Sequence, residues 1–180
     1  MRHGHDHKVT LLGLSGSLRA ESSNTTLLRA AAETCRAGVE FALACGLGEL
    51  PHFNPDLPLS TSPRLLSFVE QMRTCDGLVV SSPVYAGGYP GTLKNALDWL
   101  VGTDAFVDKP FMMLSASSRM PAAQATLVTV LQTMSGRHIE TASITIDLLG
   151  THPSVDGILR HPEHGPALRA ALARFAEHLR

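Results

Sequence analysis

Two short stretches of this sequence carry groups that could bind a ligand. The first, residues 13–24, reads GLSGSLRAESSN and lies between an apolar run and an amphipathic segment. Such a turn from a strand into a helix presents unpaired N–H groups at the positive end of the helix dipole, and glycine lets the backbone approach a ligand. Further donors are the Arg19 guanidinium and the hydroxyls of Ser15, Ser17, Ser22, Ser23 and Thr25. Together these groups suit a phosphate, although a plain turn capped by serines has the same composition.

The second stretch, residues 82–91, reads SPVYAGGYPG and follows the apolar run 78–81. Its prolines, glycines and tyrosines predict a rigid, partly apolar ledge on which a flat ring could lie while backbone N–H groups bond its heteroatoms. A phosphate on one side and a flat ring on the other describe a mononucleotide such as FMN. The alternative is that Tyr85 and Tyr89 only cover the surface.

The elements that must position these stretches alternate between strand and helix. Apolar periodicity predicts strands at 9–14, 39–43, 78–81, 110–114 and within 139–149, and helices at 24–36, from Pro63, at 92–101, at 121–134 and from Pro166. This alternation predicts an α/β fold, with a parallel sheet in the order 2-1-3-4-5 and helices on both faces. In that order the first and third strands are neighbours, so both stretches should face one crevice at the carboxyl edge of the sheet.

Length and composition narrow the class of protein. The 180 residues suit a single domain over 9–180, preceded by a disordered tail over 1–8 that contains three histidines. A net charge of −1 does not indicate a basic surface for binding nucleic acid, and no apolar run is long enough to cross a membrane. The three cysteines form no CxxC pair, which suits reduced thiols in the cytoplasm. Lys94 and Asp98 are expected to form an ordinary i, i+4 surface pair, and no metal site or catalytic residue is predicted.

The sequence resembles one known family. Gly16-Ser17-Leu18-Arg19, with Ser22 and Asn24, resembles the opening motif of the NADPH-dependent FMN reductases, and SPVY at 82–85 followed by YPGTLKNALDWL at 89–100 resembles their second signature. The resemblance implies a three-layer flavodoxin-like sandwich that binds FMN and takes hydride from NADPH. It also implies a small acceptor (free flavin, a quinone, an azo compound or chromate) and assembly into a homodimer or homotetramer.

The resemblance also assigns roles along this chain. Ser17, Arg19, Ser22, Asn24 and Thr25 would hold the FMN phosphate, and Pro83, Val84, Tyr85 and Gly87 would border the isoalloxazine. Ser15 and Ala86 complete these two loops, and Ser115, Ser117 and Ser118 would lie in a third loop against the ring. The family commonly has a Gly-Gly pair in that third loop, whereas residues 115–121 read SASSRMP. Backbone near a flavin edge often needs glycine, so this departure bears directly on flavin binding.

Three alternatives remain open at this level. The chain could be a flavodoxin-type electron carrier, or a relative that has lost its flavin. It could also be a serine hydrolase, because Gly13-Leu14-Ser15-Gly16-Ser17 nearly matches the G-x-S-x-G elbow, and Asp147 and His152 follow in the order that a triad requires.

Overall fold

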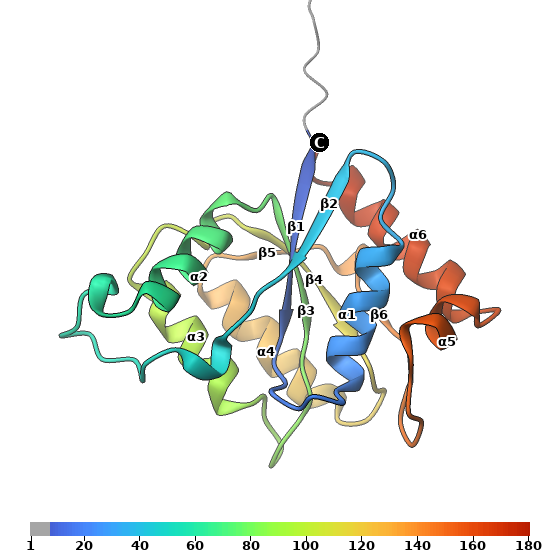
Figure 1. Ribbon diagram of the computed structural model, residues 1–180, viewed down its shortest axis with the longest axis horizontal. Helices are drawn as coiled ribbons and strands as arrows, with labels where there is room; N and C mark the ends of the chain where they lie inside the picture. Colours follow the sequence, from blue (N-terminus) through green and yellow to red (C-terminus); the bar gives the residue numbers. More distant parts are fainter. Residues whose placement is uncertain (1–7) are drawn as a thin grey trace, which may run out of the picture.

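The computed structural model describes residues 8–180 as one α/β unit (Figure 1). The tail predicted over residues 1–8 falls almost entirely on residues 1–7, which lie outside the described part of the chain. The strands are β1 (Val9–Ser15), β2 (Val39–Leu43), β3 (Gly77–Ser81), β4 (Pro110–Ser115), β5 (Arg137–His138) and β6 (Ile144–Thr145). The helices are α1 (Ser23–Glu33), α2 (Pro63–Thr74), α3 (Gly91–Val101), α4 (Pro121–Thr133), α5 (Val155–Arg160) and α6 (His164–Glu177). Short 3₁₀ turns occupy Leu47–Glu49, Leu59–Thr61 and Glu140–Ala142.

The parallel sheet has the order β2-β1-β3-β4-β5, as the alternation of elements predicts. The fifth strand, however, was predicted as one element within 139–149, whereas the structure has two short strands, β5 just before that range and β6 within it. β5 and β6 both pair with β4, and a 3₁₀ turn separates them. The backbone N–H of Met113 in β4 donates to the Ser143 hydroxyl at 3.0 Å, so a side chain replaces the backbone carbonyl that a continuous neighbour would supply. This hydrogen bond satisfies the Met113 N–H at the break.

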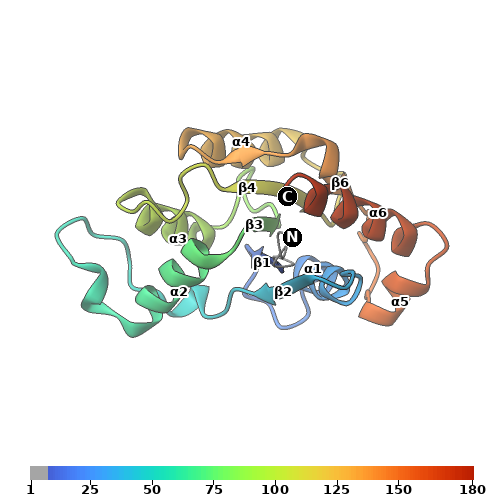
Figure 2. The same cartoon turned by 90° about the horizontal axis from the view of Figure 1, so that it is seen from above.

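Helices cover both faces of the sheet, giving three layers (Figure 2). Alternate residues of each central strand enter opposite cores, as the strand period of two requires. In β3, Leu78 and Val80 pack on the side of α2, α3 and α4, whereas Val79 packs on the side of α1, α5 and α6. Because both faces are buried, the central strands are apolar at almost every position.

Serine caps begin several helices and fix where the loops end. The hydroxyls of Ser22 and Ser62 accept from the N–H groups of Thr25 and Leu65, which starts α1 and α2 close to their predicted positions. The same device at Ser154 starts α5 within a segment that was predicted to be a loop as far as Gly165. That prediction was wrong because the short helix has too few apolar residues to show a helical period.

Lys94, Asp98 and Trp99 of α3 make contacts within the fold. Lys94 forms its i, i+4 ion pair with Asp98 on the surface. The indole N–H of Trp99 donates to the carbonyl of Pro51 at 2.8 Å, and the ring is buried. These contacts hold the long segment between β2 and α2 against α3. Within residues 8–180, no helix is long and apolar enough to cross a membrane.

Replacing Ser135 by glycine is expected to stabilise the protein by about 1 kcal/mol. Ser135 follows α4 with φ of 67°, a left-handed conformation that L side chains disfavour. Its N–H donates to Gln132, and that of Gly136 donates to Leu131, which is the hydrogen-bond pattern of a Schellman C-cap with serine where glycine is usual. Urea denaturation would measure the gain; an unchanged or lower free energy of unfolding would contradict it.

Stability is expected to fall at mildly acidic pH. Burial, together with the nearby charge of His161, lowers the pKa of His164, and the two imidazole rings stack with centroids 3.6 Å apart. Burial likewise lowers the pKa of His138. The unfolded state therefore binds more protons, and the free energy of unfolding should decrease as the pH drops below about 6.5. Urea denaturation over this range should show a weaker decrease in His164→Gln; an equal decrease in the variant would refute the assignment.

Candidate functional site

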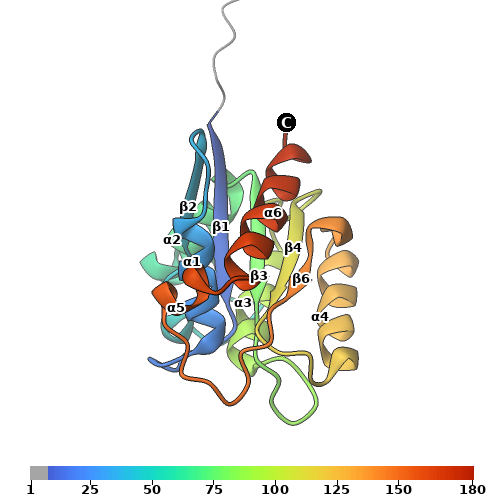
Figure 3. The ribbon, with the colours of Figure 1, turned by 90° about the vertical axis from the view of Figure 1, so that its right-hand side faces the viewer.

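Four loops meet at the carboxyl edge of the sheet and enclose a pocket of about 700 Å³. The loops follow β1, β3, β4 and β6, and Figures 1 and 3 show all four at the lower end of the molecule. The sequence-predicted site residues that line the pocket are Arg19, Ser22, Asn24, Pro83, Val84 and Ser117. Its volume falls in the range of small-molecule and cofactor sites. The two glycine-rich stretches therefore do face a common cavity.

The β1–α1 loop ends at the N-terminus of α1. Ser22 is buried and caps the helix, while Asn24 accepts from the Ser81 hydroxyl at 3.0 Å and so connects this loop to β3. Ser15, Ser17 and Thr25 are not part of the pocket lining: the Ser15 hydroxyl lies 2.8 Å from that of Thr25 and accepts from the Ser17 N–H at 3.2 Å. Hydrogen bonds among these three residues stabilise the loop, and the exposed Arg19 lines the pocket.

The β3–α3 loop contributes a short wall and a projecting tip. Pro83 and Val84 line the pocket, but Tyr85, Ala86 and Gly87 extend beyond its lining. Tyr85 and Gly88 exchange both backbone hydrogen bonds, and Ala86 and Gly87 between them have φ of 50° and 79°. Two successive positive φ values define a type I′ hairpin turn, which is stable without a ligand. The tip is therefore preformed.

The β4–α4 loop reaches the left-handed conformation without a glycine. Met120, at the N-cap of α4, has φ of 59° and ψ of 53° and lines the pocket. Ser115 is buried at the end of β4, and the Ser118 hydroxyl donates to Asp147. That hydrogen bond, together with the Leu149 N–H, holds the pKa of Asp147 below its usual range. The loop thus keeps an irregular backbone at a conformational cost of about 1 kcal/mol at Met120.

Sequence reasoning missed several residues of the pocket. Glu21, Gln124 and the loop 148–153 all line it. The Gln124 amide donates to the Ser82 carbonyl at 3.1 Å, and its Oε1 is buried without a hydrogen-bond partner among the described residues. The only sequence signal for the loop 148–153 was its content of glycine, histidine and proline, which also fits an ordinary loop.

The geometry does not assemble a hydrolytic triad. The Ser15 hydroxyl pairs with Thr25, and Asp147 pairs with Ser118 and the Leu149 N–H. His152 lines the pocket wall, but no hydrogen bond joins it to Ser15, Ser17 or Asp147 in the structure of residues 8–180. The same residues include no cluster of three or more side chains suited to a metal ion. The serine-hydrolase alternative therefore lacks the contacts that it needs.

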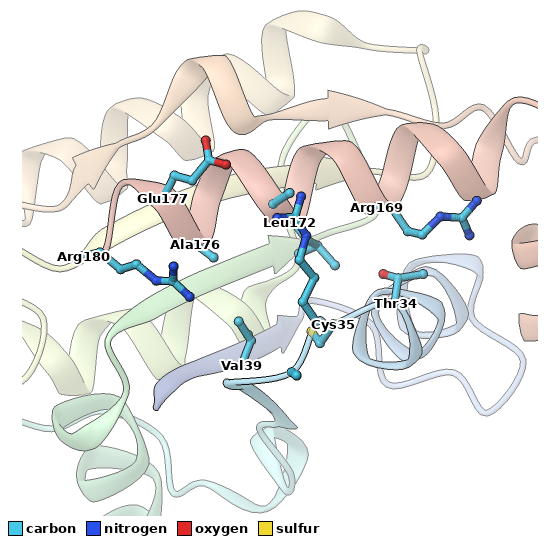
Figure 4. Close-up of a pocket in the computed structure, with 11 residues that line it drawn as sticks. Thr34, Cys35, Val39, Arg169, Leu172, Ala176, Glu177 and Arg180 are labelled. Carbon is cyan, nitrogen blue, oxygen red and sulfur yellow. The ribbon is translucent and has the colours of Figure 1, made fainter. Parts of the chain in front are cut away.

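A smaller groove of about 80 Å³ lies at the opposite, amino-terminal edge of the sheet (Figure 4). It runs between the end of α1 and α6 and is lined by Val39 of β2 and Leu172 of α6, with Arg169 and Arg180 toward the two ends of α6. Burial raises the pKa of Cys35 in this groove to about 11, so its thiol is neutral near pH 7. The groove is remote from the loops, and it is too small for a nucleotide.

Solved structures share this fold over nearly the whole chain. The flavoenzyme NAD(P)H:acceptor oxidoreductase FerB of Paracoccus denitrificans superposes with a TM-score of 0.77 at 23% identity, covering 95% of this chain and 97% of that one. A flavodoxin-type WrbA-like protein of Agrobacterium tumefaciens superposes with a TM-score of 0.58 at 15% identity, covering 96% and 97%. At these identities the likeness establishes the fold alone, and that fold is flavodoxin-like.

Sequence comparison identifies the family within this fold. The model of the NADPH-dependent FMN reductases matches residues 9–148, and the chain belongs to that family. An NAD(P)H-dependent FMN reductase of Pseudomonas aeruginosa is 35% identical over 113 residues, which is 61% of this chain and 60% of that protein. An NAD(P)H:quinone oxidoreductase of Solanum tuberosum is 34% identical over 114 residues, or 60% and 58%. The chain thus matches about three-fifths of the length of these relatives.

The pocket residues fit FMN. Ser22 occupies the N–H of Thr25, which leaves the first N–H groups of α1 and the Arg19 guanidinium for an anion such as the FMN phosphate. An unpartnered buried acceptor is costly, and the Gln124 Oε1 would be stabilised by a ligand N–H or hydroxyl. FMN carries both kinds of donor. The donor and acceptor set therefore agrees with the family's cofactor.

Proposed function

We propose that this protein is an FMN-dependent NAD(P)H oxidoreductase that reduces a small acceptor, either a flavin or a quinone. The observation that carries the proposal is that one cavity is lined by the N-terminus of α1 with Arg19 and by the apolar residues Pro83 and Val84. That pairing matches the two ends of FMN, phosphate and ring. Membership of the NADPH-dependent FMN reductase family supports the same assignment.

The chemistry that FMN supplies when bound is two-electron transfer between a nicotinamide and an acceptor. The protein's own part is to bind and orient. Arg19 and the first turn of α1 neutralise and fix the phosphate, with Ser15, Ser17 and Thr25 holding the loop in shape. Pro83 and Val84 exclude water from one edge of the ring, and the third loop, with Ser117, closes another edge. No side chain is required as an acid or base.

The test is a visible spectrum of the protein loaded with FMN, repeated after anaerobic addition of NADPH. Loss of the flavin absorbance near 450 nm, roughly the usual flavin maximum, followed by its return on addition of a quinone, would support the proposal. Steady-state double-reciprocal plots should be parallel, because donor and acceptor would use one face of the ring in turn. A protein that binds no FMN would be the flavin-free relative, and one that binds it without oxidising NADPH would be an electron carrier.

We also propose that the protein works as a homodimer or homotetramer in the cytoplasm. Phe53 and Leu57, in the segment between β2 and α2, and Tyr85, at the tip of the loop after β3, are exposed apolar side chains that a second copy would cover. The thiols of Cys35, Cys45 and Cys75 are all free, which suits a reducing compartment. Sedimentation equilibrium would test the assembly, and fractionation of the cells that produce the protein would test the location.

A further inference from the structure

Two large apolar side chains are exposed on the wall of the cofactor pocket. Met120, from the loop after β4, is 50% exposed, and Leu149, from the loop after β6, is 44% exposed. Both line the same cavity, although 29 positions of sequence separate them. Large apolar side chains left in water at a binding site indicate a ligand surface of matching character.

The conformation of Met120 makes a purely structural role a poor explanation. Its φ of 59° is one that glycine adopts without cost and that a residue with a Cβ atom disfavours. Pro121 directly after it starts α4, so the backbone there is fixed by the helix. Strain retained at a site is a reason to look for a function of the side chain. Methionine is also flexible and polarisable, which suits contact with flat rings of differing shape.

We propose that Met120 and Leu149 form an apolar lip that binds the ring of an uncharged quinone and favours it over anionic acceptors. This inference rests on the proposed function and names the acceptor class within it. Leu149 lies directly beyond the region 9–148 that the family model matches, and Met120 lies within it. Arg119 lines the same pocket and would attract anions, so the two features predict opposite acceptor preferences.

The experiment measures binding and preference in the FMN-loaded protein. The dissociation constant of 2-methyl-1,4-naphthoquinone is measured calorimetrically without NADPH, and kcat/KM is measured for this quinone and for ferricyanide. In Met120→Gln and in Leu149→Gln, the dissociation constant should rise, and the quinone-to-ferricyanide ratio of kcat/KM should fall, each by about tenfold. Val101→Gln removes an apolar side chain that is 65% exposed at the end of α3, outside the pocket lining, and should change neither quantity.

Met120→Gly distinguishes the effect of the Met120 side chain on quinone binding from the effect of its backbone strain on stability. It should raise the melting temperature by removing the strain, and still weaken quinone binding about tenfold, so a folding defect cannot explain the loss. Native affinity for the quinone in the lip variants, or a quinone-to-ferricyanide ratio unchanged from the native protein, would overturn the inference while leaving the proposed function intact. Failure of the native protein to oxidise NADPH with any acceptor would instead remove the proposed function, and the inference with it.

Discussion

Gly16→Ala should weaken FMN binding by about tenfold or more and lower the free energy of unfolding by about 1–3 kcal/mol. A Cβ atom on Gly16 would lie 2.4 Å from the Ser82 hydroxyl oxygen and 2.9 Å from the Ser82 Cβ, with Leu93 Cδ2 at 3.2 Å. The N–H of Gly16 also donates to the Ser81 carbonyl at 2.9 Å, so the residue cannot move away without losing this hydrogen bond. The loops after β1 and β3 would have to separate, and the pocket lies between them.

Flavin fluorescence titration and urea denaturation would measure the two effects. Ser82→Gly removes both contacted atoms of Ser82, so the double variant should recover part of the FMN affinity, with a coupling energy of about 1 kcal/mol or more. Gly102→Ala is the matched control, because a Cβ atom there meets nothing within 4 Å. Native FMN affinity in Gly16→Ala, or purely additive losses in the double variant, would show that the close approach of the two loops is not what shapes the site.

Arg19→Ala should weaken FMN binding by about 10- to 100-fold and leave riboflavin binding nearly unchanged. A charge-assisted hydrogen bond contributes about 1.5–3 kcal/mol, and only FMN has the phosphate that Arg19 would contact. Arg19→Lys should keep part of the affinity, because it retains the charge but not the planar, bidentate geometry. Arg160→Ala, which breaks an exposed ion pair with Asp156 on α5, serves as the control.

Replacing Glu21 in the same loop is expected to change FMN affinity in the opposite direction. It lines the pocket beside Ser22, where its carboxylate would repel the phosphate of the proposed cofactor. Glu21→Gln should therefore tighten FMN binding by about threefold at low salt, with less effect at high salt because exposed charges are screened. For the Arg19 prediction, equal losses of FMN and riboflavin affinity in Arg19→Ala would show that Arg19 does not contact the phosphate.

The elements that carry the site were predictable because their signals are local. The apolar runs of β1, β3 and β4 mark strands that are buried on both faces, and Ser22 and Ser62 stand directly before amphipathic segments. The strand order then followed from the alternation of strands and helices. The second signature at 82–100 was long enough to indicate the family, and the match over residues 9–148 confirms it.

The glycine-free third loop shows where local reasoning fails. Residues 115–121 contain no residue that favours positive φ, yet Met120 adopts it. The Ser118 hydroxyl is held by Asp147, which lies 29 positions further along the chain, and α4 begins directly after Met120. A conformation imposed from both ends in this way leaves no trace in the composition of the loop.

The sequence by itself determined the class of fold, the crevice between two glycine-rich loops and the kind of ligand that such a crevice suits. These properties depend on periodicity, helix caps and short motifs, each written within a few neighbouring residues. Only the tertiary structure decided that the loop 148–153 and Gln124 complete the pocket, that Ser143 takes the Met113 N–H where the fifth strand is broken, and that Met120 and Leu149 line one cavity. The physical reason is that each of these facts is a contact between distant segments, whose energy depends on packing that no local pattern records.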